Sequence, residues 1–265
     1  MTAIAVTIAG SDSSGGAGIQ ADLKTFSALG VYGASVIAAL TAQNTRGVTA
    51  IHDVPPDFIA AQIDAVFSDL SVDAVKIGML SVPAAITAVA DGLARHRARN
   101  IVLDPVMIST SGARLLAPEA VDTLIRLLLP AADLITPNLP EAAALLDAAV
   151  ATTEAEMRGQ GEALLARGAR AVLIKGGHSE GPESVDLLVT PAGVARFTAP
   201  RVTTKNTHGT GCTLSSAVAA GLAHGLPLAA AVGDAKAYVA AAIAAADRLT
   251  IGTGFGPVHH FHRWW

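Results

Sequence analysis

Short apolar runs that alternate with longer segments rich in Ala and Leu constrain the fold of this chain more than any other feature. The first run, residues 3–9, ends at Gly10, and residues 18–29 after it have helical periodicity. Further short runs at 31–40, 74–77, 101–104, 134–136 and 171–174 alternate with predicted helices at 57–69, 83–97, 118–128, 141–146 and 153–167. Strands that alternate with helices form a mostly parallel sheet covered on both faces. The sequence therefore predicts an α/β fold of this kind.

The last third of the chain has a different pattern. Residues 185–189 and 193–197, separated by Thr-Pro-Ala, predict a small antiparallel hairpin at an edge of the sheet. Two Ala-rich helices are predicted after it, at 213–224 and 227–249. No stretch has the composition of an interdomain linker, and no fixed-period repeat is present. We therefore expect residues 1–265 to form a single domain.

Composition excludes several classes of protein. The chain is 51% apolar and 15% charged, whereas disordered chains are poor in apolar residues. Its net charge of −4 argues against nucleic-acid binding through a broad basic surface. Cys212 is the only cysteine, which excludes a disulfide framework and paired-cysteine zinc sites. We expect a cytoplasmic protein, because the N-terminus lacks a basic segment and the most apolar stretches fall short of the roughly 20 residues of a membrane-spanning helix.

The most informative motif is Asn-Thr-His-Gly-Thr-Gly-Cys-Thr at 206–213, directly before an Ala-rich helix. Gly209 and Gly211 allow a tight turn that points backbone N–H groups at one spot, and the helix N-terminus adds positive charge. The segment thus predicts an anion-binding site for a phosphate. Because Cys212 lies at the helix start, we expect its thiol pKa to fall below the usual value of about 8.5. A glycine-rich turn with a small buried cysteine explains the segment about equally well.

Ligands bind at the carboxyl ends of the strands in open α/β sheets, and other polar residues lie there. Asp104 and Glu141 each follow a short strand and, with Asn138, could hold Mg²⁺ beside nucleotide phosphates. Lys175 ends another strand and could contact a phosphate. Helix caps and a lysine at a turn are the alternative interpretations. The histidines and tryptophans at 259–265 are more typical of a packed or frayed terminus than of a metal site.

Gln43 and Asn44 follow an apolar run and place two amides where a substrate would lie. A carboxamide has a donor beside an acceptor and so matches the amino group and ring nitrogen of an aminopyrimidine. In isolation, a hydrogen-bonded loop amide is the better interpretation. The glycine-rich residues 10–18 lack the spacing of a dinucleotide-binding loop. They could admit a small substrate close to the backbone, or form a turn capped by Asp12 or Ser13.

In this order, the segments resemble the ribokinase-like superfamily, and within it the hydroxymethylpyrimidine/phosphomethylpyrimidine kinases of thiamin biosynthesis. The resemblance covers nearly the whole chain, through AGSDSSGGAGIQADLKTF, LTAQNTRGV, VKIGML, DPVM, ITPNLPEAAALL, VLIKGGH, THGTGCTLSSA and GPVHHFH. It implies phosphorylation of 4-amino-5-hydroxymethyl-2-methylpyrimidine, and then of its monophosphate, with ATP and Mg²⁺. It also implies a ribokinase-like fold, without the β-lid insertion of members closer to ribokinase.

The resemblance assigns roles to individual residues. Cys212 stands where related sugar kinases have a catalytic aspartate, beside Gly209 and Gly211 in the anion hole. The other implied sets are Gly10, Gln43, Met79 and Val106 for the pyrimidine, Asn138, Lys175 and Thr210 for ATP, and Asp104 and Glu141 for Mg²⁺. Because the first acceptor is a neutral alcohol, a Cys212 thiolate could take its proton. The second acceptor is a phosphate already ionised near neutral pH, and needs no base.

Two alternatives stay open. The first is a pyridoxal kinase, since that activity occurs on the same fold. Some such relatives carry a second cysteine in the lid segment after DPVM, where this chain has Ile-Ser-Thr-Ser-Gly at 108–112, with Arg114 as the nearest basic residue. The second is a non-catalytic sensor of a pyrimidine or nucleotide, which would need neither a base nor carboxylates for a metal.

Ala-rich helices and the edge hairpin make a homodimer plausible.

Overall fold

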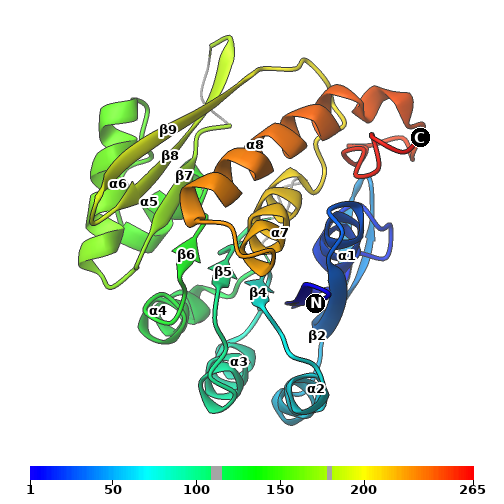
Figure 1. The fold of residues 1–265 in the computed structure, drawn as a ribbon, viewed down its shortest axis with the longest axis vertical. Helices are drawn as coiled ribbons and strands as arrows, with labels where there is room; N and C mark the ends of the chain where they lie inside the picture. The colour runs from blue at the N-terminus through cyan, green and yellow to red at the C-terminus, as the bar shows by residue number, and fades with distance from the viewer. Residues whose placement is uncertain (109–114, 178–180) are drawn as a thin grey trace.

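The computed structural model describes residues 1–108, 115–177 and 181–265, and its central feature is a sheet of nine strands (Figure 1). The strand order is β3-β2-β1-β4-β5-β6-β7-β8-β9. The bounds are β1 (Ile4–Gly10), β2 (Tyr32–Asn44), β3 (Gly47–Asp53), β4 (Ala74–Ile77), β5 (Ile101–Leu103), β6 (Leu134–Ile135), β7 (Val172–Lys175), β8 (Glu183–Thr190) and β9 (Gly193–Pro200). From β2 to β7 neighbours pair in parallel, whereas β3, β8 and β9 pair antiparallel.

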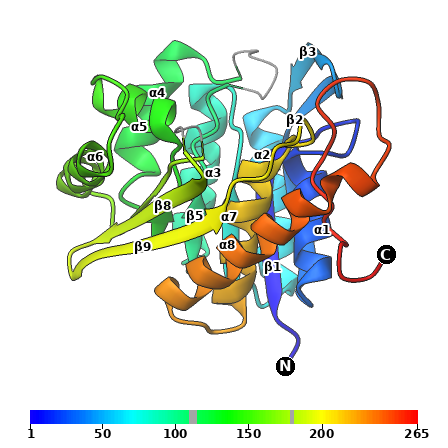
Figure 2. The same ribbon diagram turned by 90° about the horizontal axis from the view of Figure 1, so that it is seen from above.

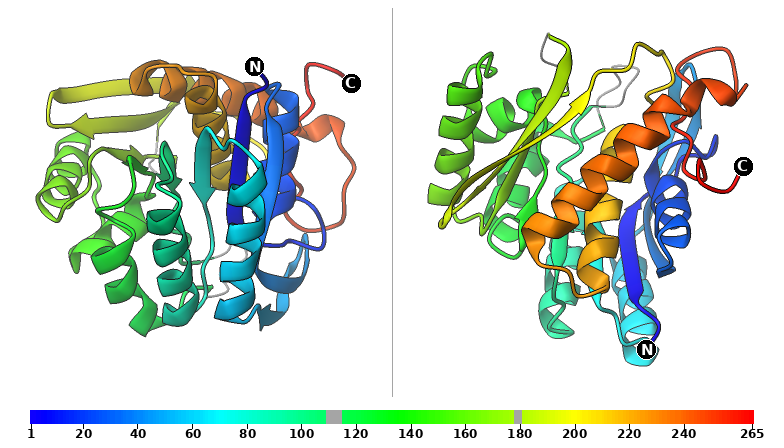
Figure 3. Two further views of the ribbon diagram at one scale, coloured as in Figure 1. Left: turned by 60° about the horizontal axis from the view of Figure 1, so that its bottom comes forward. Right: turned by 45° about the horizontal axis from the view of Figure 1, so that its top comes forward.

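Helices cover both faces of the sheet. One face carries α1 (Gly18–Ala28), α7 (Thr210–Ala223) and α8 (Leu228–Ala244), with the short 3-10 helix η1 (Ala246–Arg248) after α8. The other carries α2 (Pro56–Asp69), α3 (Pro83–Arg95), α4 (Pro118–Leu127), α5 (Leu139–Leu146) and α6 (Glu154–Ala166). Figure 2 shows β9 running beside α8, and Figure 3 shows the layers from two more directions. Each face buries its own apolar cluster, as a sheet with parallel strands requires.

Local sequence signals explain where several helices begin. Proline occupies the first turn of α2, α3 and α4, where its fixed φ favours helix initiation. α5 and α6 instead begin with capping boxes, in which the N-cap side chain and a glutamate three residues later satisfy each other's backbone N–H groups. The capping box of α5 joins Asn138 and Glu141, so it places both residues just beyond the carboxyl end of β6.

The predicted architecture is confirmed. The chain has the mostly parallel sheet, the helices on both faces and the antiparallel edge hairpin, formed by β8 and β9. Residues 11–17 lead from β1 into α1 with no strand inserted in the sheet, as expected for a fold without the lid insertion. Helix and strand bounds differ from the predicted ones by a few residues.

Three elements, β2, β3 and α7, differ from the prediction in ways that affect the site. β2 continues to Asn44 and pairs with β3, so Gln43 lies on a strand rather than in a loop. The sequence did not predict β3, because most of its residues are exposed and it lacks the alternation of a half-buried strand. α7 begins at Thr210 rather than at residue 213, which places Cys212 inside its first turn.

By length and composition, the stretch Leu228–Arg248 is long and apolar enough to cross a membrane. The expectation that every apolar stretch is too short to do so is therefore wrong. In the fold this stretch forms α8 and η1. α8 packs against α7 and β9, and its buried residues belong to the apolar cluster on that face of the sheet. This packing buries 39% of the most apolar window of the stretch.

Candidate active site

The carboxyl ends of the parallel strands meet at a cavity of about 620 Å³. Every residue to which the resemblance assigns a role lines it: Gly10, Gln43, Met79, Asp104, Val106, Asn138, Glu141, Lys175, Gly209, Thr210, Gly211 and Cys212. Asn44, the second predicted amide, does not line it. The lining residues come from segments more than 200 positions apart in the chain. The fold therefore brings together in one place what the sequence shows only as separate motifs.

The loop before α7 has the geometry of an anion-binding site. Gly209 has φ 80°, and a Cβ there would lie 1.9 Å from the carbonyl oxygen of Gly16, so only glycine fits. Among the described residues, no hydrogen-bond partner faces the backbone N–H groups of Gly209, Gly211 and Cys212. These donors are left available at the positive end of α7. Thr210 differs, because both its N–H and its hydroxyl donate to Thr207 O.

Cys212 has a less acidic thiol than the sequence predicted. Its pKa is raised to about 11, mainly by burial; the Lys76 ammonium lowers it, and the nearby Asp22 and Asp104 carboxylates act in the same direction as burial. The expectation of a lowered pKa is therefore wrong for the ligand-free protein. The loss of water around the thiol outweighs the favourable field of the helix N-terminus.

A buried ion pair that the sequence reading missed lies beneath Cys212. Lys76 and Asp22 are both fully buried, and Lys76 Nζ lies 2.8 Å from Asp22 Oδ2. Thr7 Oγ1 and Ser216 Oγ also donate to the Asp22 carboxylate. Lys76 lines the cavity, and its ammonium lowers the pKa of the Cys212 thiol. The available signal was a lysine inside the otherwise apolar strand VKI, because such a charge needs a partner.

The predicted Asp104, Glu141 and Lys175 form one cluster. Lys175 Nζ lies 2.7 Å from Asp104 Oδ1 and 3.8 Å from Glu141 Oε2. Burial alone would raise the pKa of Asp104, but Lys175 and Lys76 hold it below its usual value. Burial raises the pKa of Glu141 to about 7, and Asp104 contributes in the same direction despite the attraction of Lys175. Two ammonium groups thus compensate Asp104, whereas Lys175 compensates Glu141 only in part.

This donor set fits Mg²⁺. Within residues 1–108, 115–177 and 181–265, no three His, Cys, Asp or Glu side chains gather closely enough to hold a metal alone. Mg²⁺ typically binds one or two carboxylates and completes its shell with phosphate oxygens and water. The ionised carboxylate of Asp104 and the incompletely compensated carboxyl of Glu141 are suited to a divalent cation brought in with a nucleotide.

The predicted pyrimidine residues lie at the ends of β1, β2, β4 and β5. A Cβ on Gly10 would lie 2.5 Å from Met79 Cε, so glycine is needed for Met79 to cover the end of β1. Gln43 is held by its backbone, because Ser13 Oγ donates to Gln43 O and accepts from Gln43 N. Its side-chain Oε1 lies 3.1 Å from Thr41 Oγ1.

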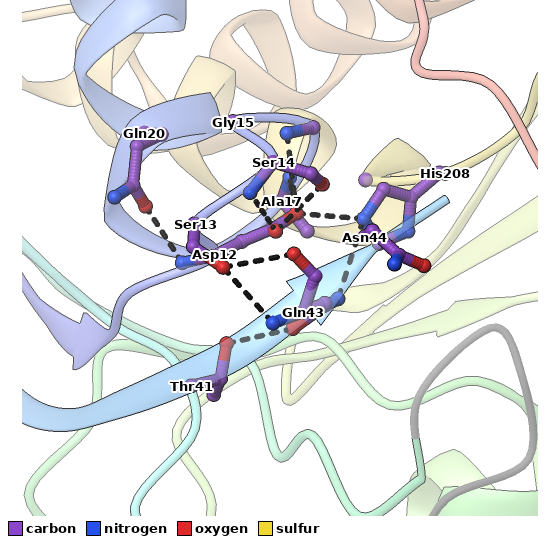
Figure 4. A network of polar contacts seen from close by, with 12 residues as sticks. Asp12, Ser13, Ser14, Gly15, Ala17, Gln20, Thr41, Gln43, Asn44 and His208 are labelled. Carbon is purple, nitrogen blue, oxygen red and sulfur yellow. Dashed lines mark hydrogen bonds and ion pairs between the residues drawn. The ribbon is translucent and has the colours of Figure 1, made fainter. Parts of the chain in front are cut away.

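Asp12 organises the loop between β1 and α1 (Figure 4). Its nearly buried carboxylate accepts hydrogen bonds from the backbone N–H groups of Ser14, Gly16 and Ala17, and lies 2.7 Å from His208 Nε2. Burial alone would raise the pKa of Asp12, but the hydrogen bonds from His208 and Ser14 hold it well below its usual range. Neither of the two predicted caps caps α1, whose N-cap is Ala17 with no side-chain hydrogen bond. Asp12 instead holds the turn before the helix, and Ser13 contacts Gln43.

The C-terminal segment, residues 252–262, packs against two loops of the site, and its His259 and His260 are buried, whereas Trp264 and Trp265 after it are exposed. Phe255 N donates to Thr45 O in the turn between β2 and β3. His208 N donates to Gly256 O, and Val258 N to His208 O. The segment thereby joins the turn beyond Gln43 to the loop before α7.

A further wall of the cavity was not predicted. It consists of apolar residues from α8 and from the end of β9: Val239, Ala240, Ile243, Ala199, Pro200 and Val202. Nearby, Lys236 Nζ lies 2.7 Å from Asp186 Oδ2, and Asp186 Oδ1 accepts from Gly176 N. Ala and Val in a helix carry no chemical signature, so the sequence could not mark this wall. The predicted lid residues beyond Ile108 lie outside the described residues.

Comparisons with known proteins give a consistent family. Residues 12–259 match the family model described as phosphomethylpyrimidine kinase. The hydroxymethylpyrimidine/phosphomethylpyrimidine kinase of Rhizobium meliloti is 64% identical over 265 residues, covering 100% of this chain and 99% of that protein. The Salmonella typhimurium protein of the same name is 61% identical over 261 residues, covering 98% of each. Thiamine biosynthesis bifunctional protein ThiED of Geobacter sulfurreducens is 54% identical over 255 residues, covering 96% of this chain and 51% of that protein.

Solved structures have the same fold. A phosphomethylpyrimidine kinase from Clostridium difficile superimposes with a TM-score of 0.79 and 47% identity, covering 89% of this chain and 97% of that one. Bacillus subtilis pyridoxal kinase in complex with ADP gives 0.92 and 35%, with 100% of both chains covered. Staphylococcus aureus pyridoxal kinase with AMP-PCP and pyridoxal gives 0.91 and 33%, covering 100% of this chain and 95% of that one.

Proposed function

The chain belongs to the phosphomethylpyrimidine kinase family, and on that premise we propose that it phosphorylates 4-amino-5-hydroxymethyl-2-methylpyrimidine and then its monophosphate, with ATP, for thiamine biosynthesis. One observation carries the proposal: the loop before α7 reaches both halves of the required site. His208 of this loop lies 3.4 Å from the Gln43 amide, and a Cβ on Gly211 would lie 3.4 Å from Lys175 Nζ. A pyrimidine at Gln43 and phosphates at Lys175 would therefore meet at one loop.

The residues present are suited to phosphoryl transfer, which depends mainly on positioning and charge neutralisation. The free N–H groups of Gly209, Gly211 and Cys212 would stabilise charge on the transferring phosphoryl group. Lys175 would hold ATP phosphates with Asn138 and Thr210. Asp104 and Glu141 would hold Mg²⁺, which neutralises phosphate charge when bound.

The two acceptors make different demands on Cys212. In the first step the acceptor is an alcohol, and we assign Cys212 Sγ as the group that takes its proton. In the second step the phosphate oxygen is already ionised, so the same anion hole serves without a base. One site can thus perform both reactions.

Pyridoxal kinases share the fold, but at 33–35% identity in the solved structures, against 61–64% for the hydroxymethylpyrimidine/phosphomethylpyrimidine kinases. The test is ATP consumption with Mg²⁺ when the pyrimidine, its monophosphate and pyridoxal are offered in parallel. We expect turnover of both pyrimidines and little of pyridoxal. Turnover of pyridoxal alone would transfer the assignment to that activity, and no turnover on any of the three would favour a sensor.

We further propose that the protein acts in the cytoplasm as a homodimer of single-domain subunits. Relatives that are 61–64% identical are bacterial hydroxymethylpyrimidine/phosphomethylpyrimidine kinases, and β3 presents an exposed edge of the sheet. Light scattering on the purified protein tests the dimer, because a monomer mass at micromolar concentration would contradict it.

A further inference from the structure

We propose that His208 and Thr41 fix the orientation of the Gln43 side-chain amide, and that the site thereby selects a 4-aminopyrimidine over its 4-oxo analogue. The inference rests on the proposed role of Gln43 in binding the pyrimidine. Figure 4 shows the three side chains together: Gln43 lies on β2 between Thr41 and His208.

The hydrogen on His208 is located by its partner. The carboxylate of Asp12 can only accept hydrogen bonds, and its Oδ2 lies 2.7 Å from His208 Nε2. His208 Nε2 must therefore carry a hydrogen. The ring is buried and its backbone is held on both sides by the C-terminal segment, so it stays in place. With its hydrogen directed at Asp12, Nε2 has no lone pair and cannot accept a hydrogen bond from the Gln43 amide.

The hydrogen on Thr41 is likewise committed. A hydroxyl has one hydrogen, and Thr41 Oγ1 lies 2.8 Å from the carbonyl oxygen of Ser11, which only accepts. The Thr41 oxygen can then only accept from Gln43. Gln43 thus has a protonated nitrogen that cannot accept on one side, His208, and an acceptor on the other, Thr41.

These neighbours favour one of two orientations of the amide. As drawn, Gln43 Nε2 lies 3.4 Å from His208 Nε2, and Oε1 lies 3.1 Å from Thr41 Oγ1, which opposes donor to donor and acceptor to acceptor. The two ends of an amide are nearly alike in shape, and the hydrogen-bond partners decide between them. We infer the turned amide, with its oxygen toward His208 and its nitrogen toward Thr41.

The fixed amide leaves one oxygen lone pair and one N–H for a ligand, in a set order. A 4-aminopyrimidine matches it with its amino group on the His208 side and its ring nitrogen on the Thr41 side. The 4-oxo analogue has an acceptor beside a ring N–H, which is the reverse order. It would fit only if the amide turned back against both neighbours.

The test compares kcat/KM for the first phosphorylation of the aminopyrimidine and of its 4-oxo analogue. In Thr41→Val and in His208→Leu we expect kcat/KM for the aminopyrimidine to fall about tenfold, and its preference over the 4-oxo analogue to fall about tenfold or more. The KM for ATP should stay within about twofold of the wild-type value. Thr41→Ser and His208→Gln should restore the preference, because each returns the lost polar group. His224→Leu, the same substitution at an exposed histidine outside the cavity, is the control.

A double-mutant cycle shows whether the effect passes through Gln43. In a Gln43→Ala background, adding Thr41→Val or His208→Leu should cost little further activity. Additive losses, or equal losses on both substrates with an unchanged preference, would overturn the proposal. If the wild-type protein turns over neither compound, the proposed function fails. The orientation of the Gln43 amide is then tested separately, by measuring calorimetrically how tightly wild type and Thr41→Val bind each compound. Thr41→Val also serves if His208→Leu does not fold.

Discussion

Cys212 is the residue whose chemistry depends most on its surroundings. Its thiol titrates near 11 in the ligand-free protein, because burial disfavours the thiolate more than Lys76 stabilises it. A base with that pKa is almost fully protonated at neutral pH. The deprotonated fraction then rises about tenfold for each pH unit below 11.

This titration predicts a pH dependence that separates the two reactions. Between pH 7 and pH 9 the rate of the first phosphorylation should rise steeply, because it needs the thiolate, whereas the rate of the second should stay nearly flat above the phosphate pKa. Single-turnover rates with each acceptor measure this. Parallel profiles for the two acceptors would argue against Cys212 as the base.

Substitution of Cys212 tests the same role directly. Cys212→Ala should slow the first phosphorylation by about a hundredfold or more, a typical contribution of general base catalysis, and the second by only a few fold. Ala keeps the backbone N–H of the anion hole, so the difference between the two steps isolates the thiol. Equal losses in both would leave Cys212 a packing residue.

The Lys76–Asp22 pair predicts a large effect on stability. Lys76→Met removes one partner of a buried pair and leaves Asp22 charged and uncompensated, which typically costs about 3–5 kcal/mol. Urea denaturation measures the loss in the free energy of unfolding. Lys24→Met, at a partly exposed lysine, is the matched control and should cost far less. A loss below about 1 kcal/mol for Lys76→Met would contradict the role of Lys76 in compensating the buried charge of Asp22.

Among the elements, the C-terminal segment predicts an effect on catalysis from outside the cavity. A Cβ on Gly256 would lie 2.2 Å from Asn206 Oδ1, so Gly256→Ala must displace the loop before α7. We expect kcat/KM to fall about tenfold, since small misplacements of catalytic groups are costly. Gly159→Ala is the control and should leave kcat/KM unchanged, because no atom lies within 4 Å of a Cβ there. An unchanged kcat/KM in Gly256→Ala would show that the C-terminal segment plays no part in catalysis.

The elements also show what the sequence could predict. β1 and β4 were predicted because buried parallel strands are short continuous apolar runs. β3 was not, because an exposed edge strand lacks that signal. The site motifs were predicted because glycine turns and carboxylates at strand ends are locally unusual. Lys76 and His208 were missed as site residues, because their partners, Asp22 and Asp12, are distant in sequence.

For the whole molecule, Glu141 links stability to pH. Its pKa rises from 4.5 in the unfolded chain to about 7 in the folded one, so the folded state holds a proton that the unfolded chain releases. This contribution favours folding below pH 4.5 and is lost as pH rises through 7. Glu141→Gln should therefore gain stability relative to wild type as pH rises from 5 to 8. Urea denaturation at both pH values measures the change, and a constant difference would contradict it.

We propose that one cavity performs two successive phosphorylations. The most direct test follows the products of 4-amino-5-hydroxymethyl-2-methylpyrimidine with ATP and Mg²⁺ over time by mass spectrometry, in wild type and in Gln43→Ala. We predict that wild type forms the monophosphate and then the diphosphate, and that Gln43→Ala slows both steps together. A monophosphate that accumulates without conversion, or a Gln43→Ala variant as fast as wild type in the second step, would contradict a single shared site.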